Sequence, residues 1–237
     1  AAGGERPLLL VHDRGHGWPI VEASARFGRG LPARALPFEV NEITQISLDF
    51  LLSGLALGAE RILLLGNAAK RNDYAGLAEQ LGMAEAIMTG LGYDSGLVNL
   101  LVEDDPDRVE EELYGTRDTP DRIAGDFLPQ SQKRTNLRLA AAHLHHQAPD
   151  PQDLIPLAPG APFGTVTVDT SGCTLCLACV SACPTSALGD NPDLPQLSFQ
   201  EDACIQCGLC KNTCPENVIR LVPRFNLSKD VQERRVL

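Results

Sequence analysis

The chain reads Cys173-Thr-Leu-Cys176-Leu-Ala-Cys179-Val-Ser-Ala-Cys183-Pro184 and, 31 residues later, Cys204-Ile-Gln-Cys207-Gly-Leu-Cys210-Lys-Asn-Thr-Cys214-Pro215. Both stretches follow one pattern, C-x2-C-x2-C-x3-C-P. The two copies contain all eight cysteines of the 237-residue chain. No thiol is left for another role, so this segment carries whatever chemistry the cysteines perform.

The cysteine spacing predicts two [4Fe–4S] clusters. Three thiolates separated by two residues each let a tight loop hold three corners of a cubane, with backbone N–H groups directed at the sulfurs. In such a run the fourth cysteine of each copy ligates the other cluster. The predicted ligand sets, which are also the predicted cofactor-binding residues, are Cys173, Cys176, Cys179 with Cys214, and Cys204, Cys207, Cys210 with Cys183.

Zinc and disulfides explain the pattern less well. Structural zinc usually takes its four ligands from two separated C-x2-C pairs, and a dense run of four fits that arrangement poorly. Cysteines two residues apart make poor disulfide partners, and residues 1–172 contain no cysteine for a longer bridge.

Residues 165–223 resemble a bacterial-type ferredoxin with two [4Fe–4S] clusters, matching it at every cysteine and at Pro184 and Pro215. The resemblance implies a pseudo-twofold, ferredoxin-like α+β module. The residues agree independently. Strand-like runs at 165–169 and 219–222 are expected to pair as one hairpin, and 187–188 with 197–199 as the other.

The first 115 residues alternate between short apolar runs and helical patterns. This alternation predicts an α/β domain with a parallel sheet and helices on its faces, close to a flavodoxin-like layout. Two helical stripes support it: Leu48, Leu51, Leu52 and Leu55, then Leu77, Leu81, Ala84, Met88 and Leu91. The expected strands are 8–11, 35–40, 61–65 and 97–102, and the expected helices 20–27, 47–57, about 72–90 and 106–113.

Two loops follow strands of this predicted sheet, where ligands of α/β proteins usually bind. They are His12–Trp18 and Gly66–Asn72, and both combine glycine with basic side chains. Neither has a nucleotide-binding fingerprint, so ordinary turn chemistry is favoured over an anion or flavin site. Trp18 is expected to pack rather than to stack on a ligand.

Two further resemblances concern the same region. Gly58-Ala-Glu-Arg-Ile-Leu-Leu-Leu-Gly66 is similar to the iron-sulfur (delta) subunit of methyl-viologen-reducing hydrogenases. Val11-His-Asp-Arg-Gly-His-Gly17 and the Cys-Thr-Leu-Cys run look like multidomain 4Fe-4S proteins found with bacterial formate dehydrogenases. These resemblances imply a redox protein partner of the formate dehydrogenase or hydrogenase type.

A helix is expected over 134–147, followed by a stretch to Gly164 with five prolines that predicts a stiff connector. His143, His145 and His146 lie on this helix, where a solvated or packed face is favoured over a metal site. The predicted organisation is an α/β docking domain at 1–130, a helix and linker at 131–164, the ferredoxin domain at 165–225, and a tail at 226–237.

Composition sets further limits. The formal net charge of −11 argues against a nucleic-acid binder and favours a positively charged docking patch on a redox partner. No apolar run approaches the roughly 18 residues that would predict a membrane span. No leader pattern stands at the N-terminus, so a cytoplasmic location is expected. The chain starts without methionine, at Ala1-Ala2-Gly3-Gly4, as a fragment would, and its tail is expected to be truncated.

The resulting hypothesis is that the chain is an electron-transfer protein or subunit with two low-potential [4Fe–4S] clusters. These clusters should be reduced at about −400 mV. The α/β domain would dock the cluster module on a larger redox enzyme. The alternatives are a redox enzyme whose α/β domain binds a flavin or small substrate, and a scaffold or maturation factor for such an enzyme. No catalytic residue is predicted, because no nucleophile or paired-carboxylate arrangement stands out.

Overall fold

A computed structural model describes residues 6–115 and 122–237 of the chain. The chain divides into two compact units, Ala1–Pro151 and Gln152–Leu237. Residues 1–5 and 116–121 of the predicted docking domain lie outside the described residues. No helix in the described parts of the chain combines the length and the apolar character needed to cross a membrane.

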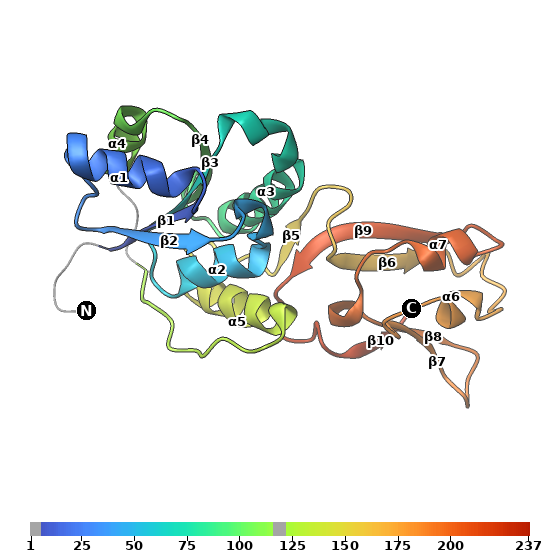
Figure 1. The fold of residues 1–237 in the computed structure, drawn as a ribbon. Helices are drawn as coiled ribbons and strands as arrows, with labels where there is room; N and C mark the ends of the chain where they lie inside the picture. The colour runs from blue at the N-terminus through green and yellow to red at the C-terminus, as the bar shows by residue number, and fades with distance from the viewer. Residues whose placement is uncertain (1–5, 116–121) are drawn as a thin grey trace. The chain divides into compact units, whose positions relative to one another are not determined.

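The N-terminal unit is built on a four-stranded parallel sheet (Figure 1). Its strands are β1 (Leu8–Asp13), β2 (Ala35–Val40), β3 (Arg61–Gly66) and β4 (Val98–Val102), in the spatial order β2-β1-β3-β4. All six residues of β3 are buried, as expected for a parallel strand covered on both faces. The predicted α/β class of this unit is confirmed.

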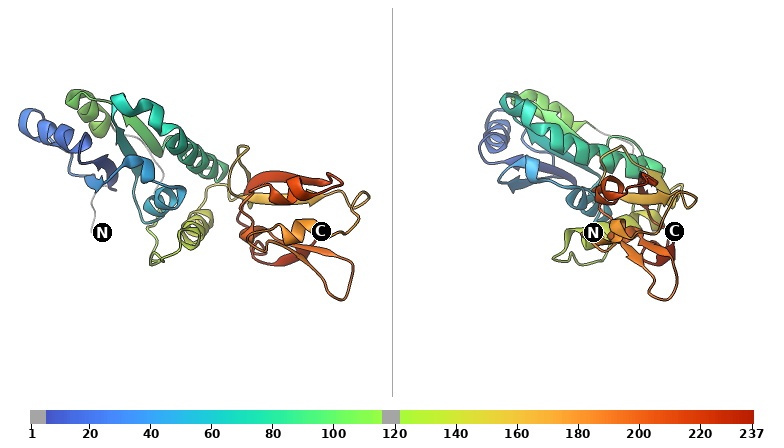
Figure 2. Two further views of the ribbon diagram at one scale, coloured as in Figure 1. Left: turned by 45° about the vertical axis from the view of Figure 1, so that its right-hand side comes forward. Right: turned by 90° about the vertical axis from the view of Figure 1, so that its right-hand side faces the viewer.

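Helices cover both faces of this sheet. On one face α1 (Gly17–Phe27) and α4 (Pro106–Tyr114) pack together. Their apolar residues form one cluster with alternate residues of β1 and β3: Leu8, Leu10, Ile20, Val21, Leu63, Leu65, Val109 and Leu113. On the other face Gly54 of α2 (Leu48–Ala56) lies against Ile62, the neighbour of Leu63 along β3. Helices α3 (Ala75–Gly90) and α5 (Lys133–His146) pack beside α2 (Figure 2).

The two helical stripes differ in how well they match the structure. The α2 stripe is confirmed, with Leu48, Leu51, Leu52 and Leu55 all buried. In α3, which follows the 3-10 turn η2 (Ala68–Tyr74), Leu81 is only half-buried. The buried face of α3 is rotated toward Ile87 because α3 packs against both α2 and β4, so Leu81 lies at the edge of that face.

The C-terminal unit contains two antiparallel sheets. Strand β6 (Gly164–Val168) pairs with β9 (Ile219–Asn226), and β7 (Leu188–Asp190) pairs with β8 (Leu197–Gln200). Both predicted strand pairings are confirmed. The short helices α6 (Ala178–Ser181) and α7 (Leu209–Thr213) pack against each other.

Two strands extend these sheets beyond what the sequence predicts. Strand β5 (Leu154–Pro156), inside the proline-rich stretch, pairs with the C-terminal half of β9. Strand β10 (Arg234–Val236), in the predicted tail, pairs with β8. Both additional strands are antiparallel to their partners. With them, each small sheet has three strands, ordered β5-β9-β6 and β10-β8-β7.

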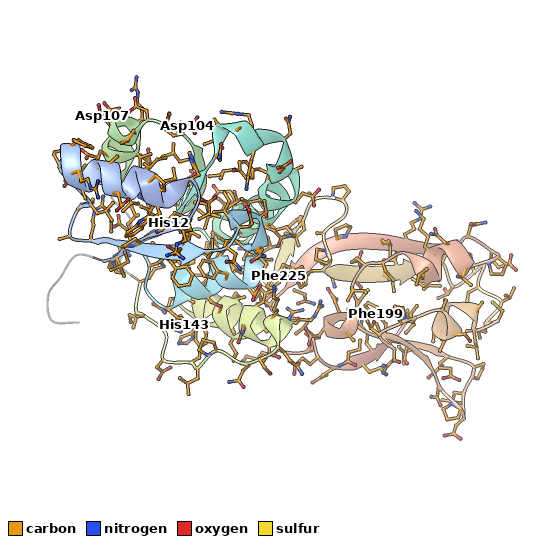
Figure 3. The ribbon with its side chains drawn as sticks, in the orientation of Figure 1. His12, Asp104, Asp107, His143, Phe199 and Phe225 are labelled. Atoms are coloured by element: carbon orange, nitrogen blue, oxygen red, sulfur yellow. The ribbon has the colours of Figure 1, made fainter. Side chains whose placement is uncertain are left out.

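The core of the C-terminal unit contains the cysteines themselves. Phe199 is completely buried at its centre, beside Leu188 and Leu197 (Figure 3). Cys179, Cys204 and Cys210 are buried members of the same cluster. The apolar core and the cysteine sites are therefore one structural feature.

Candidate metal centres

The two cysteine runs occupy equivalent positions in the two halves of the C-terminal unit. The first run follows β6; its third cysteine, Cys179, lies in α6 and its fourth, Cys183, just after it. The second run follows the 3-10 turn η3 (Glu201–Ala203); its third cysteine, Cys210, lies in α7 and its fourth, Cys214, just after it. Each short helix turns the third cysteine of its run into the core, so both of these thiols are buried.

The backbone repeats as closely as the cysteines do. Residues with positive φ occur in pairs that are 31 positions apart: Leu175 and Gln206 (54° and 53°), Leu177 and Gly208 (61° and 78°), and Ser186 and Asn217 (both 54°). Left-handed residues beside right-handed ones form a concavity of backbone N–H groups, a feature of many anion and iron-sulfur sites. The two runs are thus two copies of one loop conformation.

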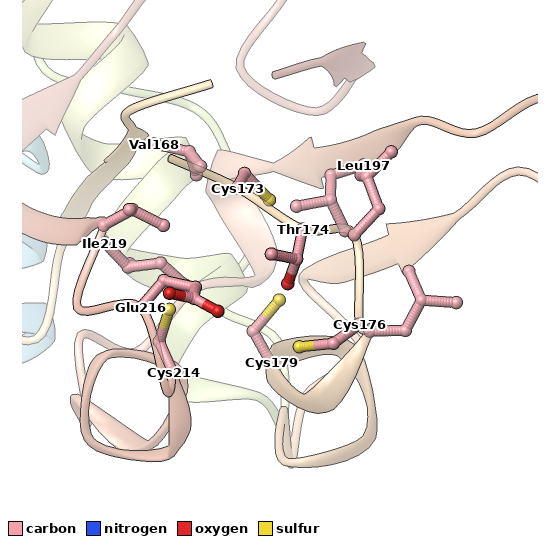
Figure 4. Close-up of a pocket in the computed structure, with 12 residues that line it drawn as sticks. Val168, Cys173, Thr174, Cys176, Cys179, Leu197, Cys214, Glu216 and Ile219 are labelled. Atoms are coloured by element: carbon pink, nitrogen blue, oxygen red, sulfur yellow. The ribbon is translucent and has the colours of Figure 1, made fainter. Parts of the chain in front are cut away.

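The first copy surrounds a cavity that is open to solvent, with about 340 Å³ of empty space that includes open solvent (Figure 4). Cys173, Cys176 and Cys179 line it, and Cys214 of the second copy completes the set. The walls are otherwise largely apolar, with Val168, Leu197 and Ile219 among them. We call these four cysteines the first-copy site.

The second copy surrounds a similar solvent-open cavity, with about 330 Å³ of empty space that includes open solvent. Cys204, Cys207 and Cys210 line it together with Cys183 of the first copy, and we call these four the second-copy site. Each cavity therefore gathers three thiols from one run and the fourth from the other. This grouping is the one expected from the sequence, while ligation by these thiols stays a prediction.

Burial and hydrogen bonds act in opposite directions on the thiols. Burial raises the pKa of Cys179 and Cys204, and raises the pKa of Cys210 to about 11. Burial also acts on Cys183, but the N–H groups of Leu188, Thr185 and Ala187 leave its pKa below the ordinary value. Because a metal ligand must be a thiolate, the positive charge of iron is needed to keep the buried thiols ionised.

The residues present fit a [4Fe–4S] cluster at each site. Four thiols surround each cavity, apolar side chains line much of it, and the left-handed loops offer backbone N–H groups. Among the described residues, no three His, Cys, Asp or Glu side chains are arranged to hold a single metal ion.

The loop after β1 is closed by its own carboxylate. Asp13 Oδ1 accepts hydrogen bonds from the N–H groups of His16 (2.6 Å) and Gly17 (3.1 Å), at the N-terminus of α1. A carboxylate thus occupies the position where an anionic ligand would bind. His12, labelled in Figure 3, is buried, and its ring lies 6.0 Å from that of Trp18. Trp18 packs one side of its ring against His12, in line with the expected packing role, and is 41% exposed.

The loop after β3 is also occupied by its own residues. Asn67 Oδ1 accepts a hydrogen bond from the N–H of Ala69 at 2.8 Å, and the Asn67 N–H donates to the Tyr74 hydroxyl at 2.7 Å. Lys70 pairs with Glu42 at 2.9 Å. Both loops therefore have the ordinary turn chemistry that the sequence favours.

His143 of α5 has a packing role in the structure. His143 Nε2 lies 2.8 Å from the carbonyl oxygen of Ile123 and 2.6 Å from Gln147 Nε2. The His143 ring, labelled in Figure 3, is also near that of Phe127. These contacts hold the segment around Ile123 against the helix, as expected for a packed helix face.

Comparison with known families identifies the class of the cysteine-rich segment. Residues 172–219 match a family model described as a 4Fe-4S dicluster domain. The chain therefore carries a 4Fe-4S dicluster ferredoxin domain, and its cysteines provide an iron-sulfur binding region. No curated protein matches the chain. The match ends at β9 and does not include the α/β unit.

Proposed function

We propose that this chain is an electron-transfer protein or subunit that carries single electrons through two [4Fe–4S] clusters. The observation that carries the proposal is the pairing of two four-thiol cavities, each completed by a cysteine from the other copy. When bound, such clusters supply one-electron reduction and oxidation. The chain's own residues hold the iron, exclude water and offset the negative charge of the sulfurs.

The walls of the cavities suit this role. Leu188 and Phe199 line the second-copy site, and Leu197 and Ile219 the first; all four side chains are almost fully buried. Apolar walls restrict solvent access, which is one of the factors that set the potential of a cluster. Cys176 and Cys207 are exposed. These two thiols mark where each site comes nearest to a docked redox partner.

We propose that the N-terminal unit is a flavodoxin-like docking domain rather than a catalytic one. The strand order β2-β1-β3-β4 supports the flavodoxin-like assignment. Asp13 at the start of α1 supports the docking role, because its carboxylate disfavours an anionic cofactor there. A flavin-free absorbance spectrum after mild purification is the expected result, and bound flavin would contradict this assignment.

The proposed partner is a redox enzyme of the formate dehydrogenase or hydrogenase type. The sequence resemblances at Val11–Gly17 and Gly58–Gly66 motivate it, together with the net charge of −11. An acidic carrier docks on a basic patch, so the association should weaken as salt rises. Association that does not depend on salt would contradict electrostatic docking.

Anaerobic iron and sulfide analysis with a potentiometric EPR titration tests the proposed function. About eight iron atoms per chain and two low-potential, interacting signals are expected, in line with two cubanes. Zinc in place of iron, or iron for only one cluster, would contradict the proposal.

A further inference from the structure

The two cysteine sites differ in the side chains that approach their sulfurs. Because the copies are 31 residues apart, each residue of one has a counterpart in the other. Gln206 of the second copy corresponds to Leu175 of the first, and both have the same left-handed backbone. Thr185, in the second-copy site, corresponds to Glu216, in the first-copy site.

Gln206 provides a side-chain hydrogen bond that Leu175 cannot provide. Its backbone N–H lies 3.4 Å from Cys204 Sγ, and its side-chain Nε2 lies 3.5 Å from the same sulfur. The same amide donates to the carbonyl oxygen of Thr165 at 3.1 Å, which fixes its orientation. Leu175 has no polar side-chain atom, so the second-copy site gains one donor.

Thr185 adds a second hydrogen-bond donor to the second-copy site. Its hydroxyl lies 3.8 Å from Cys183 Sγ. A thiolate ligand has no proton to give, so the hydroxyl must be the donor in the loaded protein. Lys211, next to Cys210, stands where the first copy has Val180, but its side chain is exposed and does not line the cavity. The nearby Glu201 is neutralised by Arg224 at 2.6 Å.

Glu216 places a negative charge at the first-copy site instead. It lies two residues after Cys214 and lines the cavity, with its side chain exposed (Figure 4). A carboxylate opposes the negative charge that reduction adds, whereas hydrogen-bond donors stabilise it. Cys173 is more exposed than Cys204, and Thr174 lines the first-copy cavity where the second copy has Ile205; both differences would favour reduction of the first-copy site. The donors at Gln206 and Thr185 and the carboxylate of Glu216 act the other way.

We infer that the second-copy site has the higher reduction potential, so that a single electron rests on the side of Cys183, Cys204, Cys207 and Cys210. The inference rests on the proposed function. An electron that passes from the first-copy site to the second oxidises the former and reduces the latter, with no bond made or broken. The molecule is thus an asymmetric carrier. Gln206, Thr185 and Glu216 act through the cysteine sulfurs, and they set which of the two sites holds the electron.

Potentiometric EPR titration of the full-length holoprotein and four variants tests the inference. The wild type should show two one-electron steps at different potentials. Gln206→Leu and Thr185→Val should each lower the more positive step, and Glu216→Gln should raise the more negative one. Leu175→Gln, which gives the first copy the residue of the second, should also raise the more negative step.

Two variants provide matched controls. Gln232→Leu and Glu233→Gln make the same chemical changes at exposed positions that line neither cavity, so both steps should stay in place. Equal potentials in the wild type, or a shift of the more negative step by Gln206→Leu and Thr185→Val, would overturn the inference. Thr185→Val keeps the shape of the side chain, which protects the test if Gln206→Leu does not fold.

Iron analysis separates this inference from the proposed function. If the wild type binds iron and sulfide for two clusters but the shifts have the wrong sign, only the asymmetry is wrong. If it binds fewer than two clusters, the proposed function fails, and the inference fails with it.

Discussion

Arg224 and Glu201 form a two-point ion pair, with Nε 2.8 Å from Oε1 and Nη2 2.6 Å from Oε2. Glu201 is only 5% exposed. It starts the turn that leads to Cys204, while Arg224 belongs to β9, so the pair joins the second cysteine run to the sheet. A partly buried pair of this kind is costly to break.

Glu201→Gln should therefore lower the free energy of unfolding of the C-terminal unit by about 3 kcal/mol, because it removes the charged carboxylate that pairs with both Arg224 and Arg235. Denaturant unfolding of the holoprotein measures it. The matched control is Glu111→Gln, which breaks the exposed 3.0 Å pair with Arg108 and should cost less than about 1 kcal/mol. Equal losses in the two variants would show that burial of the pair has no energetic role.

The exchange of fourth cysteines predicts which variants resemble one another. Cys176→Ser and Cys207→Ser should each damage one cluster, and the EPR spectrum of the remaining cluster identifies the site. Cys183→Ser should then match Cys207→Ser, although Cys183 belongs to the first run. A Cys183→Ser spectrum that matches Cys176→Ser, or that retains both clusters, would overturn the predicted ligand sets.

Gly208 has a backbone conformation that disfavours side chains. Its φ is +78°, and an added Cβ would lie 3.6 Å from Leu221 Cδ1, an ordinary contact. Gly208→Ala should therefore lower the free energy of unfolding of the C-terminal unit by about 1–2 kcal/mol, through backbone strain alone. Thermal unfolding measures this loss. Gly82→Ala is the control: Gly82 lies inside α3 with open space around it, so alanine should stabilise by about 1 kcal/mol. Equal effects would contradict the left-handed conformation of Gly208.

Asp13 makes a two-donor cap at the start of α1, whereas Asp105 caps α4 through the single N–H of Asp107 at 3.0 Å. Asp13→Ala should lower the free energy of unfolding of the α/β unit by about 2 kcal/mol, and Asp105→Ala by about 1 kcal/mol. Denaturant titration followed by helical circular dichroism distinguishes the two losses. A larger loss for Asp105→Ala would contradict the stronger cap at Asp13.

Removal of the clusters should affect the two units differently. The core of the C-terminal unit contains Cys179, Cys204 and Cys210, so without iron it has buried thiols around two cavities. The α/β unit has an apolar core of its own. In calorimetry of the iron-stripped protein, the unfolding transition of the C-terminal unit should therefore disappear or move to a lower temperature. The transition of the α/β unit should be retained. A single transition shifted as a whole would contradict independent unfolding.

Much of the fold follows from local patterns in the sequence. The mostly apolar run Arg61–Leu65 is continuous and defines β3, whereas the stripe from Leu48 to Leu55 is periodic and defines α2. Strands β5 and β10 are three residues each, and they exist only because β9 and β8 offer them free edges. Leu154–Pro156 also ends in proline, which favours a connector interpretation when its partner is unknown.

At the cysteine sites, too, local patterns in the sequence predict only part of the structure. Spacing alone brings each run together, because the cubane requires it, and the crossing of Cys183 and Cys214 follows from the same pattern. The donors at Gln206 and Thr185 and the carboxylate of Glu216 depend on where the chain folds back. A residue-by-residue alignment of the two copies was the available signal, since it places Gln206 opposite Leu175 and Glu216 opposite Thr185.

The exchange of Cys183 and Cys214 also bears on how the protein is made. The first-copy site needs a residue that is synthesised 35 positions after Cys179. If the ligand sets are as predicted, a ribosome that has made only the first run presents three thiols without their fourth. Cluster insertion must then await synthesis of the second run. A nascent chain that ends after the first run would carry neither site intact.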